Sequence, residues 1–361
     1  GSNGNTVGGG NLIGANRYGI HVKDSSNTTI VANSLGVAGA GNEQFGVWLL
    51  NAANTTIGGG SAAQGNTLAS NGRNGIFAEG SSSGLTIGFN TVTSSVQEGI
   101  VLRGTGVSGA VLDSNTLTGN QSDGVLVDAA TGVRITRTTT NNNTGNGIRL
   151  INGGNANRAA PTLSATLVGG PNGQPAVTGT ASGCASPGCV VEIFSSATRA
   201  DGEGPRFLAS ATSDPATGAF TIEIPGCDRF LTATARDPQN NTSPFSTPMV
   251  DTVTGCTAAK PTLSAGTPAS SSASPQQVAP GSSITFKHTL TNSGGLPGTF
   301  TISATPGAQN WQVQVSPTSV SLAANQSIEI DVTVTVPLNA RGGPPPEAVT
   351  VTASVGAETA S

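Results

Sequence analysis

The sequence predicts an all-β protein, in which a parallel β-helix is followed by two β-sandwich modules. Three observations predict this fold class. A glycine-led motif recurs six times, about every 25 residues, within the first 155 residues. After residue 158 this period stops, and alternating strand patterns separated by Pro, Gly and Asp turns follow. Charged residues make up only 9% of the chain, against roughly 25% in an average soluble protein, while Gly, Ser, Thr and Asn are abundant.

Each repeat of the first region opens with a glycine, then Ile or Val, then an alternating strand. The six copies are Gly19-Ile20-His21-Val22, Gly46-Val47-Trp48-Leu49, Gly75-Ile76-Phe77-Ala78, Gly99-Ile100-Val101-Leu102, Gly124-Val125-Leu126-Val127 and Gly147-Ile148-Arg149-Leu150. The intervals between the glycines are 27, 29, 24, 25 and 23 residues. A second apolar anchor follows the first five glycines by 11 or 12 residues, at Ile30, Ile57, Ile87, Val111 and Ile135. Short strands at this period predict the coils of a β-helix, because each strand can pair with its counterpart in the next coil.

A third element of the repeat is an asparagine followed by Ser or Thr and then Leu or Val. It occurs at Asn33, Asn66, Asn90 and Asn115. Equivalent turns bring these amides into a stack, so we expect a ladder of hydrogen bonds from coil to coil. Such a ladder satisfies turn backbone that would otherwise be buried without partners.

Two segments of the sequence resemble the repeats of a known family. Asn5-Thr6-Val7-Gly8-Gly9-Gly10-Asn11-Leu12-Ile13 and Asn54-Thr55-Thr56-Ile57-Gly58-Gly59-Gly60 resemble repeats of secreted bacterial right-handed parallel β-helix proteins of the pectate-lyase-like superfamily. The resemblance covers residues 1 to about 155 and implies a right-handed solenoid. It does not indicate one function, because enzymes, adhesins and structural proteins all use this fold. The first coil reads as incomplete, so we expect upstream coils or another subunit to cover it.

The remaining chain predicts two immunoglobulin-like sandwiches. We expect a β-helix over 1–157, a first sandwich with disulfides over 158–256, a linker over 257–277 and a second sandwich over 278–361. The strand candidates are 176–181, 190–195, 207–212, 219–224 and 230–235 in the first sandwich, and 282–292, 298–304, 311–316, 327–336 and 348–355 in the second. Trp311 is the expected core aromatic of the second sandwich.

Four cysteines lie in the first sandwich, and an even count in one module predicts two disulfides in an oxidising compartment. They are Cys184, Cys189, Cys227 and Cys256. We favour the pairs Cys184–Cys189 and Cys227–Cys256 among three possible connectivities. The alternatives are four reduced thiols or a zinc site, but for zinc the spacing matches no usual motif and neither histidine lies nearby.

Charge and hydropathy exclude two partner classes. The net charge is −4 and no basic run occurs, which argues against a nucleic-acid partner. No stretch of about 18 apolar residues exists that could span a membrane. The neutral polar composition and the even cysteine count instead predict an extracellular or cell-surface location, and we expect the partners to be other copies of the chain, other surface proteins or a glycan.

The outward positions of the glycine-led strands give a candidate interaction face. One file begins with the aromatic residues His21, Trp48 and Phe77, and the neighbouring file holds Leu50, Glu79, Arg103 and Asp128. Exposed apolar clusters mark interaction surfaces, and aromatic rings suit sugars or another chain. The alternative for the charged file is a solvated ladder of weak ion pairs.

The sequence contains no pattern that predicts catalysis, a cofactor or a metal. Asp113, Asp123 and Asp128 fall on different strands and turns, so they make a poor calcium site. We expect a non-enzymatic structural or adhesive protein, such as a filament, surface-layer or matrix subunit. The alternative is a carbohydrate-binding or polysaccharide-degrading β-helix protein that uses the face just described.

Overall fold

The computed structural model describes residues 2–37, 39–165, 167–169, 174–196, 202–225, 230–250, 259–264, 266–268, 278–295, 298–323, 325–340, 348–356 and 358–361. These residues form strands, turns and two 3-10 helices, η1 (Ala62–Gln64) and η2 (Gly154–Asn157). Two compact units are present. The first contains the β-helix and most of the second module, and the second contains the C-terminal sandwich.

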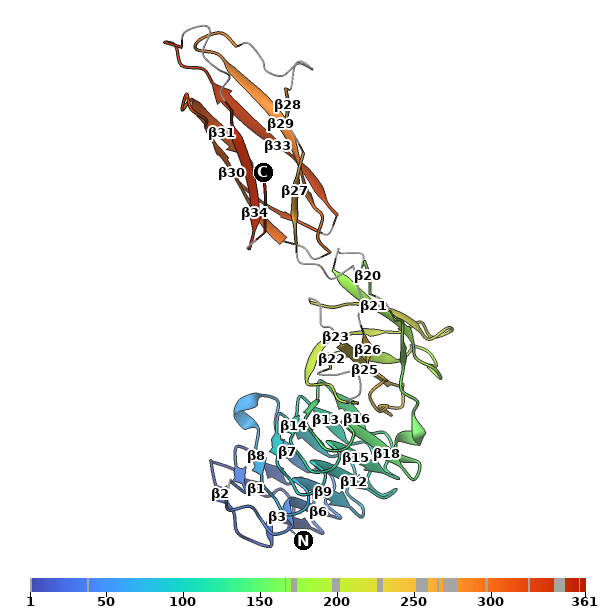
Figure 1. Cartoon of the computed structure of the whole chain (residues 1–361). Helices are drawn as coiled ribbons and strands as arrows, with labels where there is room; N and C mark the ends of the chain where they lie inside the picture. Colours follow the sequence, from blue (N-terminus) through green and yellow to red (C-terminus); the bar gives the residue numbers. More distant parts are fainter. Residues whose placement is uncertain are drawn as a thin grey trace. The chain divides into compact units, whose positions relative to one another are not determined.

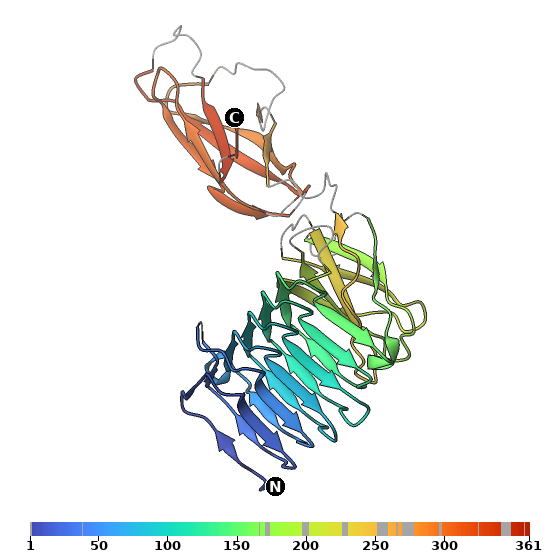
Figure 2. The same cartoon turned by 60° about the horizontal axis from the view of Figure 1, so that its bottom comes forward.

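The N-terminal region is a parallel β-helix with three six-stranded sheets, and its coils are stacked in Figures 1 and 2. Sheet A contains β1 (Thr6–Val7), β4 (Thr29–Ile30), β7 (Thr56–Gly58), β10 (Thr86–Gly88), β13 (Val111–Asp113) and β16 (Arg134–Thr136). Sheet B contains β2 (Leu12–Ile13), β5 (Ser34–Leu35), β8 (Thr67–Ala69), β11 (Thr91–Thr93), β14 (Thr116–Thr118) and β17 (Thr139–Asn141). Sheet C contains β3 (Tyr18–Lys23), β6 (Phe45–Leu50), β9 (Ile76–Glu79), β12 (Ile100–Arg103), β15 (Val125–Asp128) and β18 (Ile148–Ile151).

The interior of the β-helix is an apolar column to which all three sheets contribute. The spacing correctly placed Ile30, Ile57 and Ile87 inside. It was wrong at the next coil, where Leu112 pairs with Ile87 and is buried, while Val111 pairs with Thr86 on the outer face. The loop between β12 and β13 is one residue longer than the corresponding loop between β9 and β10 in the preceding coil. A shift of one residue reverses the side of the sheet that a strand residue faces.

The glycine that opens each repeat is required by close approach between coils. A Cβ atom on Gly99 would lie 2.7 Å from the backbone oxygen of Gly124, and one on Gly124 would lie 2.7 Å from that of Gly147. Both glycines have φ values outside the left-handed region. The repeat therefore uses glycine for its small size, because any side chain would push neighbouring coils apart.

Asparagine ladders run along the coils, as the sequence predicted. Asn66 Nδ2 donates to Asn90 Oδ1 at 2.9 Å, and Asn90 Nδ2 donates to Asn115 Oδ1 at 3.0 Å. A second ladder, which the sequence analysis missed, follows the other corner of sheet B. It joins Asn42 to Asn71 and Asn120 to Asn143, and between these pairs Ser95 donates only its backbone N–H to Asn120 Oδ1, while its hydroxyl is buried without a partner among the described residues. Ser95 interrupts the asparagine pattern, so this ladder has a weaker signature in the sequence.

The second module is a two-sheet sandwich, as the sequence predicted. One sheet contains β19 (Thr162–Leu163), β21 (Pro175–Thr180), β20 (Val168–Gly169) and β24 (Ala219–Glu223). The other contains β23 (Arg206–Thr212), β22 (Val190–Ser195), β25 (Phe230–Arg236) and β26 (Met249–Val250). The predicted disulfide Cys184–Cys189 is confirmed. Cys227 and Cys256 lie outside the described residues.

The second module closes the C-terminal end of the β-helix. Phe194 and Phe245 belong to the same hydrophobic cluster as the solenoid interior, and their rings meet edge to face at 5.2 Å. Two buried carboxylates also join the parts. Glu203 accepts a 2.6 Å hydrogen bond from Asn143 Nδ2 and so continues the second ladder, while Glu192 accepts the backbone N–H of Arg137 at 2.8 Å. The β-helix and this module therefore share one core.

The C-terminal sandwich is also built from two sheets. One contains β27 (Pro261–Leu263), β28 (Thr267–Pro268), β29 (Ser283–Asn292), β33 (Ser327–Thr335) and β31 (Gln312–Ser316). The other contains β32 (Ser319–Leu322), β30 (Gly298–Thr305), β34 (Thr350–Val355) and β35 (Glu358–Ala360). Two expectations for this region were wrong. The expected linker 257–277 contains β27 and β28, which pair with β29. The core aromatic is the fully buried Phe300, whereas Trp311 lies just before β31 and is only half-buried.

Candidate functional site

The candidate face lies on the outer side of sheet C, with the register that the sequence predicted. His21 pairs with Trp48, which pairs with Phe77, and Arg103 pairs with Asp128. Each of these residues stands on a strand of successive coils, so their side chains follow the solenoid axis. Whether this face binds a ligand stays a prediction.

The aromatic side chains of sheet C form two ring stacks. His21 and Trp48 lie parallel, with centroids 4.0 Å apart and planes 4° apart. Beside them Phe45 stacks on Tyr18 at 5.9 Å and on Phe77 at 4.8 Å. The faces of these rings are therefore turned largely toward one another, along the solenoid axis, rather than presented as a flat sugar-binding platform.

Arginines extend the second stack at both ends. The guanidinium of Arg17 lies 5.2 Å from the ring centroid of Tyr18, and that of Arg103 lies 5.1 Å from that of Phe77. We call Arg17, Tyr18, Phe45, Phe77 and Arg103 the ring column. Phe77 points outward as expected but is only 6% exposed, because the column covers it. Phe45 was not singled out in the sequence, since it precedes the repeated glycine.

The charged file of sheet C is paired differently from the expected arrangement. Arg103 Nε lies 3.1 Å from Asp128 Oδ2, and Asp128 also accepts Asn152 Nδ2 at 2.7 Å. Glu79 Oε1 instead accepts the indole N–H of Trp48 at 3.1 Å. Arg103 is therefore engaged by one carboxylate and by the ring of Phe77, and Glu79 serves to hold Trp48.

The three aspartates considered for calcium each meet a different arginine. Asp113 pairs with Arg137, Asp123 with Arg149 and Asp128 with Arg103. Among the described residues no group of three or more His, Cys, Asp or Glu side chains is placed to hold a metal ion. These aspartates act as ion-pair partners between neighbouring coils.

His21 has a perturbed pKa on this face. Burial lowers the pKa of His21 below its ordinary value of 6.5, and the charge of Lys23 acts in the same direction, while Asp24 opposes them. The imidazole stacked on Trp48 is therefore predominantly neutral at pH 7.

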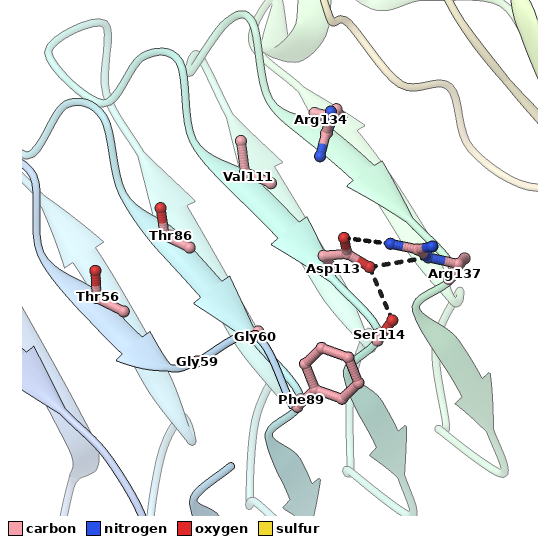
Figure 3. Close-up of a pocket in the computed structure, with 11 residues that line it drawn as sticks. Thr56, Gly59, Gly60, Thr86, Phe89, Val111, Asp113, Ser114, Arg134 and Arg137 are labelled. Carbon is pink, nitrogen blue, oxygen red and sulfur yellow. Dashed lines mark hydrogen bonds and ion pairs between the residues drawn. The ribbon is translucent and has the colours of Figure 1, made fainter. Parts of the chain in front are cut away.

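A groove of about 560 Å³ lies on a different surface, the outer face of sheet A, and sequence reasoning missed it (Figure 3). Thr56, Thr86, Val111 and Arg134 lie in register along one side of it. Its other lining residues are Gly59, Gly60, Gly88, Phe89, Asp113, Ser114 and Arg137. The signal that could have revealed it is the set of glycines Gly59, Gly60 and Gly88, which line it without side chains.

One end of the groove is formed by a bidentate ion pair (Figure 3). Arg137 Nη2 lies 2.6 Å from Asp113 Oδ2, and its Nε donates to Oδ1 at 3.1 Å. Burial by itself would raise the pKa of Asp113, but hydrogen bonds from Arg137 and Ser114 outweigh this effect and lower it. Asp113 is therefore ionised and neutralised by Arg137 at this end.

None of the helices in the described part of the chain combines the length and apolar character that crossing a membrane requires.

Two family models match the chain. A model of the right-handed β-helix region matches residues 41–162, and a model of the VWA7 Ig-like domain matches residues 268–361. No curated protein matches the chain significantly.

Several solved structures are similar at low identity. The BSP domain of a biofilm associated protein is 16% identical with a TM-score of 0.20, over 56% of this chain and 27% of that one. Escherichia coli alpha-2-macroglobulin activated by porcine elastase is 14% identical with a TM-score of 0.20, over 56% and 21%. The enzymatically active domain of tailspike protein 2 from bacteriophage CBA120 is 10% identical with a TM-score of 0.32, over 94% and 58%. The chain thus spans less than two thirds of each structure. From the coils and the two family matches, the chain is a right-handed β-helix protein with an immunoglobulin-like domain near its C-terminus.

Proposed function

We propose that this chain is a non-enzymatic extracellular protein with a structural or adhesive role, in which the β-helix serves as a rigid scaffold. The observation that carries the proposal is the ring column on sheet C. Its aromatic rings, at 4.8 and 5.9 Å, stack on one another and hold successive coils together. The side chains that the sequence suggested as a binding platform therefore contact mainly one another, across neighbouring coils.

The pairing of the charged residues supports the absence of catalysis on sheet C. Hydrolysis of a glycoside by two carboxylates requires both groups to flank the bond at a defined separation. Glu79 is engaged by Trp48, and Asp128 is engaged by Arg103 and Asn152. Both carboxylates thus have structural partners. The Cys184–Cys189 disulfide, together with the β-helix and the immunoglobulin-like domain, fits an extracellular protein.

An activity assay on the whole chain tests the non-enzymatic part of the proposal. The protein is incubated with neutral, uronate-containing and sulfated polysaccharides, and new reducing ends and unsaturated products are measured. We expect none. Turnover that is lost in both Glu79→Gln and Asp128→Asn would overturn the proposal and support a polysaccharide-degrading enzyme on sheet C.

Assembly is tested by negative-stain electron microscopy and sedimentation of the same sample. Filaments or end-to-end chains would assign the structural role to self-association. Dispersed monomers would assign it to attachment to other surface proteins or to a glycan.

A further inference from the structure

The Cys184–Cys189 disulfide of the second module lies against the side chain of Arg158. This arginine directly follows η2, and both cysteines lie in the loop between β21 and β22. Nη2 of Arg158 is 2.8 Å from Cys189 Sγ and 3.3 Å from Cys184 Sγ, and it also donates to Ser182 O. Nη1 donates to Gly183 O at 3.0 Å. One guanidinium group therefore contacts both sulfurs and the backbone of the loop that carries them.

The positive charge of Arg158 has no counter-ion within the described part of the chain. Its contacts are two carbonyl oxygens and two disulfide sulfurs, all of them neutral. Its Nε is buried without a hydrogen-bond partner among the described residues. Hydrogen bonds to an anion are stronger than those to neutral acceptors. Reduction of the disulfide would create such an anion, a thiolate, at a position that the guanidinium group already contacts.

The two sulfurs have different surroundings, which suit a thiolate at one and a thiol at the other. Cys189 is 0% exposed, and its sulfur is the one closer to the guanidinium group. Cys184 is 7% exposed, and its sulfur lies 3.0 Å from Ala181 O. A disulfide sulfur carries no hydrogen, but a thiol at Cys184 could donate to this carbonyl. The surroundings can thus accept a Cys189 thiolate and a Cys184 thiol without rearrangement.

The residue paired with Cys189 across the sheet offers a hydroxyl rather than a carboxylate. Ser213 Oγ accepts the backbone N–H of Cys189 at 3.1 Å. The next residue, Asp214, is engaged within its own exposed turn, where its Oδ1 accepts the backbone N–H of Thr217 at 2.7 Å. Asp214 therefore neither neutralises Arg158 nor forms a hydrogen bond near the disulfide.

The loop closed by the disulfide is short and open to solvent. The cysteines are five positions apart, so the bond removes little conformational entropy from the unfolded chain and stabilises the fold less than a long-range disulfide would. Ala185, Ser186 and Pro187 between them are exposed. A reducing thiol can therefore approach the loop beside Cys184.

We propose that Cys184–Cys189 is a redox-active disulfide that exchanges with a dithiol, and that Arg158 stabilises its reduced form. A thiolate of the dithiol bonds to Cys184 Sγ, and the disulfide breaks with its electron pair going to Cys189 Sγ. A thiolate stabilised by a cation is the better leaving group. The second thiol of the dithiol loses its proton and attacks its partner sulfur in the mixed disulfide. Cys184 is released and takes up a proton, and the dithiol, oxidised by two electrons, becomes a cyclic disulfide.

This inference goes beyond the structural or adhesive role and does not depend on the ring column. The chain is the substrate of the exchange and not its catalyst, so the scaffold proposal and the redox proposal can fail separately.

Equilibration of the whole folded chain with mixtures of reduced and oxidised dithiothreitol tests the proposal. Free thiols are alkylated, and mass spectrometry of the tryptic peptide that contains Cys184, Cys189 and no other cysteine gives the reduced fraction. We expect reduction without denaturant. Arg158→Gln should lower the equilibrium constant for reduction at pH 8 by about tenfold, which corresponds to about 30 mV for a two-electron couple.

Thiolate absorbance at 240 nm separates the effect of charge from that of packing. Cys184→Ser leaves Cys189 as a thiol, and subtraction of the spectrum of Cys184→Ser/Cys189→Ser cancels the other two cysteines. An unperturbed thiol is mostly protonated at pH 7. We expect Cys189 to be mostly thiolate at pH 7, and this fraction to fall about fivefold or more when Arg158→Gln is added. Arg158→Lys keeps the charge and should give an intermediate fraction.

A matched control and two contrary outcomes complete the design. Arg73→Gln removes the charge of an exposed side chain on the β-helix and should leave both measurements unchanged. Reduction that requires denaturant, or an equilibrium constant that Arg158→Gln does not change, would overturn the proposal. Melting temperatures show which variants are folded. Should Arg158→Gln not fold, the Cys184→Ser chain still decides, because a protonated Cys189 at pH 7 would overturn the role of Arg158.

Discussion

The backbone N–H of Arg137 donates a 2.8 Å hydrogen bond to Glu192 Oε2 across the junction between the β-helix and the second module. The hydroxyl of Thr136 donates to the other oxygen of the same carboxylate. Glu192 is only 6% exposed. Burial raises its pKa above the ordinary 4.5, although the two hydrogen bonds and the charges of Arg137 and Arg236 act in the opposite direction. The junction thus contains a carboxyl group that holds its proton more tightly in the folded chain than in the unfolded one.

Because the pKa of Glu192 is raised in the folded state, this group contributes more to the stability of the folded chain at low pH than at high pH. Its contribution is fully present below the unfolded value near 4.5 and is lost as the pH rises through the higher folded value. Glu192→Gln is permanently neutral and removes this dependence. We therefore expect the difference in melting temperature, variant minus parent, to be highest at pH 7. This difference should decrease as the pH falls toward 4.5.

Scanning calorimetry of both proteins from pH 4 to pH 7 measures that difference. Other carboxyls, such as Asp113 with its lowered pKa, titrate in both proteins, so the comparison cancels them. If the difference in melting temperature between the two proteins does not change across this range, the pKa of Glu192 is not raised in the folded chain.

Asn90 provides a test of the asparagine ladder. Its Oδ1 accepts from the backbone N–H of Asn66 at 3.1 Å, and its Nδ2 donates to the backbone oxygen of Ile57 at 2.9 Å. Asn90→Ala would remove both hydrogen bonds inside the β-helix and leave the buried backbone N–H of Asn66 without this acceptor, which predicts a loss of about 1–3 kcal/mol in the free energy of unfolding. Thr67→Ala, at an exposed position on β8, should change it by less than about 0.5 kcal/mol. Equal effects in chemical denaturation would show that the ladder contributes little.

Gly99 tests whether the repeat needs glycine for its size. A Cβ atom at this position would lie 2.7 Å from Gly124 O and 3.0 Å from Asn120 Nδ2. Gly99→Ala should therefore destabilise the β-helix by about 1–3 kcal/mol, because the backbone of the next coil would have to move. Gly60→Ala is the control, since no atom lies within 4 Å of the added methyl group and φ is not positive. A denaturation midpoint for Gly99→Ala that matches the control would contradict this explanation.

The periodic parts of this chain could be predicted because each repeat carries its own signal. The glycine at the start of each repeat, the alternating strand after it and the asparagine corner each recur, so the sheets and the first ladder follow from spacing. The same reasoning was wrong at Val111, because one additional residue in a loop reverses the side that a strand residue faces. The sandwich strands such as Val190–Ser195 were found from alternation and turns alone.

The features of the surface could not be predicted in the same way. The pairing of Trp48 with Glu79 and of Arg103 with Phe77 depends on side-chain conformations that the register does not determine. The groove is lined by Gly59, Gly60 and Gly88 next to Phe89, and in the sequence each of these residues reads as an ordinary turn or strand position. The junction is equally hidden, because Glu192 is separated from Arg137 by 55 residues and belongs to another module.

Phe245 tests whether the second module and the β-helix unfold together. Its ring is buried against the last coil, where a Cβ atom on Gly147 would lie 2.7 Å from it, and it belongs to the hydrophobic cluster of the solenoid interior. Phe245→Ala should destabilise this unit by about 3–5 kcal/mol, because it opens a cavity at the end of the column. The matched control is Phe300→Ala, which removes a fully buried ring from the core of the C-terminal sandwich. Hydrogen exchange should show lost protection on β15 and β18 as well as on β25 for Phe245→Ala, and on β33 for Phe300→Ala. Lost protection that stays within β25 would mean that the second module unfolds independently of the solenoid it covers, despite their common core.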